Sequence, residues 1–402
     1  MAEQLTRFIA SRTVSIFGDR IADLALPLAI ISVTGSASKA GVVAATLQAP
    51  RVLAALHAGA LVDRVPRRKL MIGADLIQGL AYIVIGLEIS VGGARWIPLV
   101  MVALIAGMAE TVFSLAAASY LPQIVAKERL VRANGWLEAA DAGATLTGPA
   151  VGGMLLQRLG TMPALAFNSC SFLVSAILLR RLPDTRPRGP RHEAGLLLGA
   201  RLLLSRTDQL ALLVGSVYMQ LLASCALLVF FVRAKDDLDL ASGVIGLVAS
   251  AAGVGGLASS LIIARLVERR PWWMVLAIAL TVNAVGVGLL GVFTHIVLLA
   301  AAVAVLDGAS ALCFIIASAT RQRITPGEAI GRLTAASGAI TSTVRVLAVA
   351  GIGVLVDAFS ASTTLFGLAL IGAPFILAVT AYGSIVSRQR THATATAAKE
   401  SQ

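Results

Sequence analysis

The chain has 402 residues, of which 57% are hydrophobic and 13% are charged, and its formal net charge is +12 at pH 7. An ordinary soluble domain carries about 25% charged residues, so this composition excludes a soluble globular fold. The apolar residues come in runs long enough to cross a bilayer, which predicts an all-α polytopic membrane protein.

Twelve apolar spans follow one another along the chain. At 1.5 Å per residue, each is long enough to cross a hydrocarbon core of about 30 Å as a helix. The alternation of apolar and polar residues that marks strands is absent. The predicted spans are 12–34, 40–62, 70–90, 96–119, 134–157, 161–181, 208–232, 241–265, 272–293, 295–318, 331–356 and 361–386.

Basic residues concentrate in alternate segments between the spans. One set of segments, which includes both termini, holds 25 of the 33 Lys and Arg residues, and the other set holds 5. Because basic loops stay on the cytoplasmic side, both termini are expected in the cytoplasm of a protein in the plasma membrane. This distribution explains the positive charge without nucleic acid, so no nucleic-acid partner is expected.

The segment between spans six and seven differs in composition from its surroundings. It begins as a polar, proline-rich linker and continues as an apolar stretch flanked by Arg201 and Arg206, which is typical of a helix on the membrane surface. The predicted organisation is an N-terminal six-helix bundle (1–182), a cytoplasmic linker with an amphipathic helix (183–207), a C-terminal six-helix bundle (208–388) and a disordered tail (389–402).

Two short internal matches support this division. The residues from Gly59 to Pro66, at the end of span two, match those from Ala264 to Pro271, at the end of span eight, 205 positions later. A second match pairs the loop of Ile124 with that of Ile324, 200 positions later. Repeats in the same order and in equivalent loops predict two parallel six-helix pseudo-repeats.

The loop after span two carries the most specific motif in the sequence. Its pattern, G-x-L-x-D-R-x-x-R-R/K, is formed by Gly59, Asp63, Arg64, Arg67 and Arg68. It resembles the signature of the major facilitator superfamily, at the same place between spans two and three. The resemblance implies a twelve-helix transporter in which this cluster closes the cytoplasmic side of the two halves and opens during transport.

Span five contains a second motif, formed by Gly148, Pro149, Gly152 and Gly153. It resembles an element that this family associates with exporters. Proline removes a helical hydrogen bond and glycine lets helices approach closely, so this stretch can bend against a neighbour. Phe17-Gly18-Asp19 and Leu121-Pro122, among other stretches, resemble the enterobactin-exporter and macrolide-efflux branch. One departure is Ala103, which stands where proton antiporters of the family often carry an arginine.

Charged residues inside apolar spans are the candidates for function, because each costs roughly 2.5–3.5 kcal/mol at the centre of a membrane helix unless it pairs or faces water. In the family, spans one, four, seven and ten line the central cavity. The resemblance therefore implies a proton and substrate cavity formed by Asp19, Arg20, Asp23, Glu110, Tyr218, Gln220 and Asp307. Four further charges are candidates for intramembrane ion pairs: Arg51, Glu138, Asp141 and Arg345.

These observations predict a secondary transporter that exports a small organic molecule, such as a siderophore, a macrolide or another drug-like compound, by proton antiport with alternating access. The carboxylates favour a neutral or cationic amphipathic substrate. The alternative is a metabolite importer or facilitator of the same fold. No lysine follows a glycine, so no G-K-[ST] phosphate loop exists, and neither an enzyme nor an ATP-driven pump is expected. No metal or cofactor is expected, the proton gradient being the energy source. The expected partners are the substrate and the lipid bilayer, and the expected state is a monomer.

Overall fold

The computed structural model describes residues 2–91, 96–126, 129–184, 196–325 and 327–400. Within these ranges the regular structure is helical throughout, because a helix satisfies every backbone polar group of an apolar segment internally. The first six helices are α1 (Ala2–Thr34), α2 (Ala37–Arg64), α3 (Arg67–Ser90), α4 (Trp96–Ile124), α5 (Leu130–Leu159) and α6 (Thr161–Arg180). After the short α7 (Leu196–Ser205) follow α8 (Thr207–Val232), the π-helical turn η2 (Arg233–Asp237), α9 (Ser242–Arg269), α10 (Trp272–Val292), α11 (Ile296–Ile324), α12 (Gly327–Ala358) and α13 (Ala361–Glu400).

The surface of the helices is that of a protein embedded in lipid. In the described part of the chain, nine helices are long and apolar enough to cross a membrane: α3, α4, α6 and α8 to α13. Large apolar side chains face outward, including Ile97 (74% exposed), Leu261 (78%) and Leu370 (74%). Exposed apolar surface on this scale is not tolerated in water, so the chain is a multi-pass membrane protein. The remaining long helices α1, α2 and α5 are less apolar and carry charges along their length.

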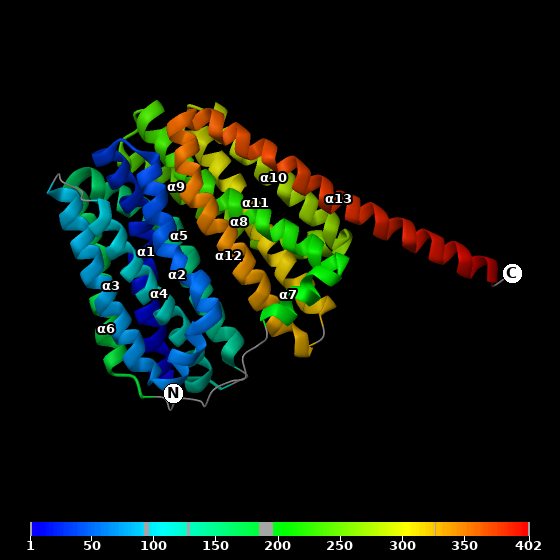
Figure 1. Ribbon diagram of the computed structural model, residues 1–402, viewed down its shortest axis with the longest axis horizontal. Helices are drawn as coiled ribbons and strands as arrows, with labels where there is room; N and C mark the ends of the chain where they lie inside the picture. The colour runs from blue at the N-terminus through cyan, green and yellow to red at the C-terminus, as the bar shows by residue number, and fades with distance from the viewer. Residues whose placement is uncertain (1, 92–95, 127–128, 185–195, 326, 401–402) are drawn as a thin grey trace.

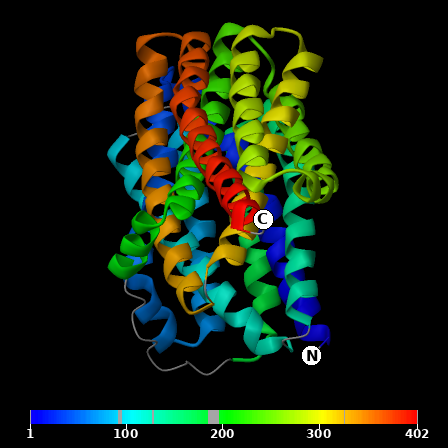
Figure 2. The ribbon, with the colours of Figure 1, turned by 90° about the vertical axis from the view of Figure 1, so that its right-hand side faces the viewer.

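The helices form two groups that lie side by side (Figure 1). The first group, called the N-bundle, contains α1 to α6: α1 packs on α5 and α6, α3 packs on α4 and α6, and α2 packs on α4. The second group, called the C-bundle, contains α8 to α13: α10 packs on α11 and α13, α9 packs on α11, and α8 packs on α12 and α13. Two helix pairs, α5 with α9 and α2 with α12, join the groups. Figure 2 shows the long helices running side by side along one direction.

The two bundles are joined by hydrogen bonds at one end, which we call the Gly35 end because it contains the turn between α1 and α2. There Asp357 of α12 accepts hydrogen bonds from the backbone N–H of Ala37 (2.9 Å) and of Ser38 (3.1 Å). Gln157 of α5 accepts one from the N–H of Gly243 at the start of α9 (3.0 Å). The opposite end, which contains the end of α6 and the short helix α7, is called the linker end.

Two regions can be compared with the sequence prediction. The helix expected on the membrane surface is α7, and its Leu203 is buried in a cluster with Leu213, Leu333 and Ala336 of α8 and α12. Its Leu204 is 62% exposed, so one side of α7 packs on protein and another faces outward. The tail predicted to be disordered from residue 389 continues α13 as a helix to Glu400 and projects from the C-bundle (Figure 1). The high helix propensity of its many alanines accounts for this.

Candidate functional site

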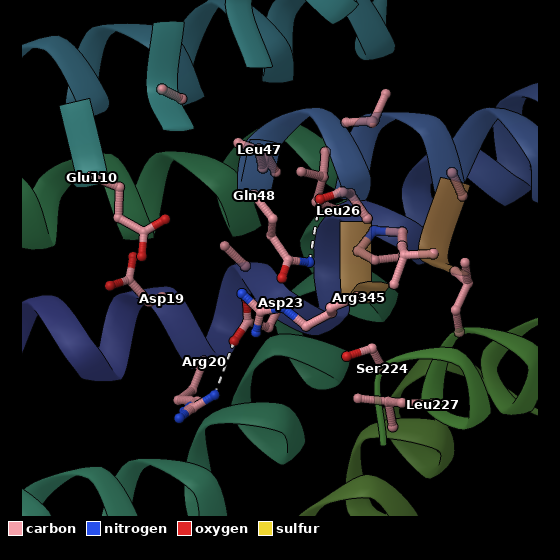
Figure 3. Close-up of a pocket in the computed structure, with 18 of the residues that line it drawn as sticks. Asp19, Arg20, Asp23, Leu26, Leu47, Gln48, Glu110, Ser224, Leu227 and Arg345 are labelled. Carbon is pink, nitrogen blue, oxygen red and sulfur yellow. Dashed lines mark hydrogen bonds and ion pairs between the residues drawn. The ribbon is translucent and has the colours of Figure 1, made fainter. Parts of the chain in front are cut away.

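A cavity of about 580 Å³ lies between the two bundles (Figure 3). Helices α1 to α5 form its N-bundle wall, and α8 and α12 form its C-bundle wall. This volume is typical of sites that hold drug-sized molecules. The charged residues that line it are Arg12, Asp19, Arg20, Asp23, Arg51, Glu110, Asp141 and Arg345. Its uncharged polar residues include Gln48, Gln78, Tyr82, Gln220 and Ser224.

Arg20 of α1 is the centre of one ion-pair cluster in this cavity. Its guanidinium donates to the carboxylate of Asp141 of α5 at 2.8 and 3.1 Å, and to Asp23, one turn further along α1, at 3.2 Å. The absence of a side chain at Gly148 permits this approach, because a Cβ atom there would lie 2.5 Å from the Cβ atom of Arg20. The glycine of the span-five motif thus brings α5 close enough to α1 for the pair to form.

A second ion pair joins α2 to α4. Arg51 donates to the carboxylate of Glu110, and both side chains are only about one third exposed. Figure 3 shows the carboxyl group of Asp19 pointing toward that of Glu110. Two carboxylates that face each other at one wall of the cavity can bind a cation.

The span-five glycines contact helices of both bundles. A Cβ atom at Gly152 would lie 2.8 Å from the carbonyl oxygen of Ile21 in α1, and one at Gly153 would lie 2.3 Å from the carbonyl oxygen of Ser242 in α9. A Cβ atom at Gly246 of α9 would lie 2.2 Å from the carbonyl oxygen of Pro149. The motif therefore forms the closely packed seam between α5 and α9.

A second, larger cavity of about 1140 Å³ lies along α8, α11 and α12 of the C-bundle. Arg20, Gln220 and Ala223 line both cavities, so the two adjoin. Asp307 and Arg321 of α11 are the C-bundle charges that line the second cavity. The structure thus places six of the seven predicted cavity residues at these two adjoining cavities.

Tyr218, the seventh predicted cavity residue, lies away from both cavities. This side chain is fully buried in the C-bundle, where its ring stacks on Phe375 of α13 at 5.2 Å and its hydroxyl lies close to Gly372. Neither cavity is lined by Tyr218. The cavity face of α8 carries Ser216, Gln220 and Ser224 at four-residue spacing, and Tyr218 lies on the other face of the helix.

Other predicted residues take other places. Glu138 is exposed and forms no ion pair with any described residue. Arg345 lines the cavity and likewise has no ion pair within the described residues. Of the predicted gate motif, the side chains of Gly59, Asp63 and Arg64 lie outside the described part of the structure, and Arg67 is buried at the start of α3.

The last residue of that motif, Arg68, connects helices of the same bundle. Its guanidinium forms a bidentate pair with Asp184 at 2.8 Å and donates to the carbonyl oxygens of Arg180 and Leu182. These contacts fix the start of α3 to the end of α6. In this conformation Arg68 does not bridge the two bundles.

Sequence reasoning missed Arg12 and Arg321. Arg12 was counted among the basic residues of the N-terminus, yet it lies seven residues before Asp19 and therefore on the same face of α1. Its guanidinium lies over the ring of Phe113 at 5.0 Å. That spacing was the signal that could have found it. Arg321 in the last turn of α11 was likewise taken for a loop charge.

The sequence profile described as Major Facilitator Superfamily matches residues 8–234, which is more than half of the chain. The chain belongs to this superfamily. The resemblance inferred from the motifs is thereby confirmed.

Two kinds of relatives are named as efflux proteins. The multidrug efflux pump Tap of Mycobacterium tuberculosis (strain ATCC 25618 / H37Rv) is 28% identical over 180 residues, which span only 44% of this chain and 43% of that relative. Tap of Mycolicibacterium fortuitum is 25% identical over 372 residues, covering 88% of this chain and 89% of that protein. The enterobactin exporter EntS of Escherichia coli O9:H4 (strain HS) is 22% identical over 382 residues, covering 93% and 90%.

Solved structures share the fold. A bacterial homologue of the iron transporter ferroportin in its inward-facing state has a TM-score of 0.75 at 17% identity, with 96% of this chain and 99% of that chain covered. The nucleoside transporter NupG has a TM-score of 0.77 at 13% identity, with 94% and 98% covered. At these identities the likeness concerns the fold alone.

Proposed function

We propose that this protein is a secondary active exporter of a small organic molecule, which it moves by rocking its two bundles around the cavity between them. The observation that carries the proposal is the charged cavity between two bundles that are joined by hydrogen bonds at the Gly35 end. Because these hydrogen bonds lie at the Gly35 end, we infer that a ligand reaches the cavity from the linker end in this state. Opening at the Gly35 end would release the ligand on the other side, which is the alternating-access cycle.

The internal repeats also support this mechanism. Asp357 of α12 caps the start of α2, and Gln157 of α5 caps the start of α9. The two capping residues are 200 positions apart, and the capped Ser38 and Gly243 are 205 positions apart, which are the offsets of the two sequence matches. We therefore propose two parallel repeats of six membrane helices each, related by an axis along the membrane normal.

The direction we propose is export from the cytoplasm across the plasma membrane. In this topology both termini lie in the cytoplasm. Two features support export: the glycine seam between α5 and α9, and relatives named as efflux proteins that align over about 90% of this chain. The substrate is a siderophore, a macrolide or another drug-like compound, and the working unit is a monomer.

The coupling we propose is proton antiport. Asp19 and Glu110 face each other on the N-bundle wall, and Asp23 is 60% exposed beside Arg20. Carboxylates in such a place can hold either protons or the cationic part of a substrate, and the exchange of one for the other couples the two fluxes. No nucleotide or metal is involved in this scheme.

The test uses everted membrane vesicles loaded with the protein and an imposed pH gradient, with a fluorescent aminoxanthene dye as the transported probe. Dye should accumulate inside the vesicles when their lumen is acid, and Asp23→Asn and Glu110→Gln should abolish the dependence on the gradient. Glu138→Gln is the control, because Glu138 is exposed and lines neither cavity. Full gradient-driven accumulation in both cavity variants would refute the assignment of Asp23 and Glu110 as coupling groups. Absence of gradient-driven accumulation in the wild type would refute antiport, and gradient-independent loss of dye from the lumen would favour a facilitator or importer.

A further inference from the structure

The charges of the first cavity are divided unequally between its two walls. The N-bundle wall carries three arginines and four carboxylates: Arg12, Arg20, Arg51, Asp19, Asp23, Glu110 and Asp141. Among the described lining residues, the C-bundle wall carries Arg345 as its only charge. With every group ionised, one wall has an excess negative charge and the facing wall has an excess positive charge. In that ionisation state the cavity has a dipole directed across the interface between the bundles.

The cations of the N-bundle wall are already engaged. Arg20 binds Asp23 and Asp141, and Arg51 binds Glu110. Arg12 is held over the face of an aromatic ring. An incoming anion would have to compete with the carboxylates for Arg20 and Arg51, and the excess negative charge of the wall would oppose its pairing with Arg12. The three arginines therefore neutralise part of the charge of the N-bundle wall, and the excess negative charge remains on it.

Arg345 is the contrasting case. It is half-buried in α12, its Nε atom is enclosed and has no hydrogen-bond partner, and the described residues form no ion pair with it. Arg51, Glu110 and Asp23 act on it electrostatically from the other wall, but each of them is already in another ion pair. Figure 3 shows its side chain reaching into the cavity toward Asp23. A guanidinium has five N–H donors in a planar fork, and donors without partners in a site of low polarity are costly.

We propose that the cavity selects dipolar substrates: Arg345 binds a carboxylate of the substrate, and a cationic group of the same molecule faces the carboxylates of the N-bundle wall. A simple cation would leave Arg345 unpaired and be repelled by it. A simple anion would face the excess negative charge of Asp19 and its neighbours. A zwitterion of drug-like size satisfies both walls. The inference rests on the proposed function, and it replaces the expectation of a neutral or cationic substrate that the carboxylates alone suggested.

The test compares two ligands that differ in one group. The first is an aminoxanthene dye with a free benzoate, which is zwitterionic, and the second is the methyl ester of the same dye, which is a cation. Equilibrium binding of each dye to the purified full-length protein in detergent is followed by fluorescence polarisation. Binding requires neither a proton gradient nor a transport direction, so its outcome is separate from that of the vesicle experiment.

The variants are Arg345→Gln, which removes the charge, and Arg345→Lys, which keeps the charge but loses the fork. Arg323→Gln is the matched control, since Arg323 is exposed near the end of α11 and lines neither cavity. The wild type should bind the benzoate dye more tightly than the ester. Arg345→Gln should weaken the benzoate dye by about tenfold or more and leave the ester unchanged or tighter, because a charge-assisted bidentate pair is lost. Arg345→Lys should be intermediate, and Arg323→Gln should match the wild type.

Several results would overturn the proposal. One is the absence of saturable binding of the benzoate dye to the wild type, and another is tighter binding of the ester. A third is equal weakening of both dyes by Arg345→Gln, which would make Arg345 a structural link between the bundles. If Arg345→Gln cannot be purified, the proposal is tested by the preference of the wild type and by Arg345→Lys. Loss of the planar guanidinium must lower the affinity for the benzoate dye relative to that for the ester.

Discussion

Replacing Asp357 should open the Gly35 end of the protein. Its carboxylate accepts hydrogen bonds from the N–H groups of Ala37 and Ser38 and from the hydroxyls of Ser36 and Ser38, all at the start of α2 in the other bundle. Loss of a capping side chain costs about 1 kcal/mol, and loss of a negative charge at a helix N-terminus costs about 0.3–1 kcal/mol where it is exposed to solvent. Asp357→Ala should therefore destabilise the closed end by about 1–2 kcal/mol, which changes the ratio of closed to open protein roughly 5- to 30-fold.

The assay is a distance measurement between spin labels across this end. The labels are attached at Val91→Cys and Val297→Cys, two exposed sites in different bundles that take no part in the hydrogen bonds of Asp357. The native cysteines Cys170, Cys225 and Cys313 are replaced by serine. Asp357→Ala should enrich the longer distances, and Asp357→Asn should do so less, because the amide oxygen still accepts a hydrogen bond.

The control is Asp239→Asn, an acid at the same end whose φ of 47° asparagine also tolerates. Unchanged distances in Asp357→Ala, or an equal change in the control, would refute the assignment of Asp357 as the residue that holds this end closed.

Three further outcomes follow from the packing and the ion pairs. Gly153→Ala places a methyl group 2.3 Å from the carbonyl oxygen of Ser242, so it should lower both the melting temperature and dye transport, whereas Gly143→Ala, with no neighbour within 4 Å, should do neither. Arg51→Glu and Glu110→Arg should each lower the melting temperature by placing like charges together, and the double reversal should recover most of the loss; no recovery would contradict their pairing. Tyr218→Phe removes a buried hydroxyl that has no partner among the described residues, so stability and transport should persist, and lost transport would place Tyr218 in the substrate path after all.

The helical fold could be predicted from the sequence because the length of an apolar run is a local property. The span predicted at 161–181 is found as α6, Thr161–Arg180. The superfamily motif was equally local. The conformation of the tail could not be predicted in this way, since it depends on whether a polar, alanine-rich segment continues the helix before it.

The candidate site was predictable only as a set of charges. An acid such as Glu110 inside an apolar run is conspicuous in one dimension, but its partner Arg51 lies 59 residues away, and Asp141 lies 121 residues from Arg20. Pairing across such separations is decided by helix packing, which small residues such as Gly148 permit. The unpaired state of Arg345 could be recognised only after the partners of the other charges were known.

One face of α12 joins the substrate site to the closed end. Arg345, Val349, Gly353 and Asp357 follow one another at four-residue spacing, and at 1.5 Å per residue they span about 18 Å of one helix face. Arg345 lines the cavity, the carbonyl oxygen of Val349 lies against Gly41, Gly353 lies against Ala37, and Asp357 caps α2. All four therefore face the N-bundle and must move together when α12 moves.

A rigid face of this kind links binding to closure. If the benzoate dye binds the conformation closed at the Gly35 end, Asp357→Ala should weaken its apparent affinity by no more than the factor by which the closed population falls, because the variant leaves the cavity itself intact. Linkage requires the reciprocal effect, so saturating dye should restore the short distances between the labels in Asp357→Ala. In the double variant Asp357→Ala/Arg345→Gln the same concentration of dye should leave the distances unchanged. Restoration in both backgrounds would show that the dye closes this end through contacts other than Arg345, and α12 would then not be the connecting element.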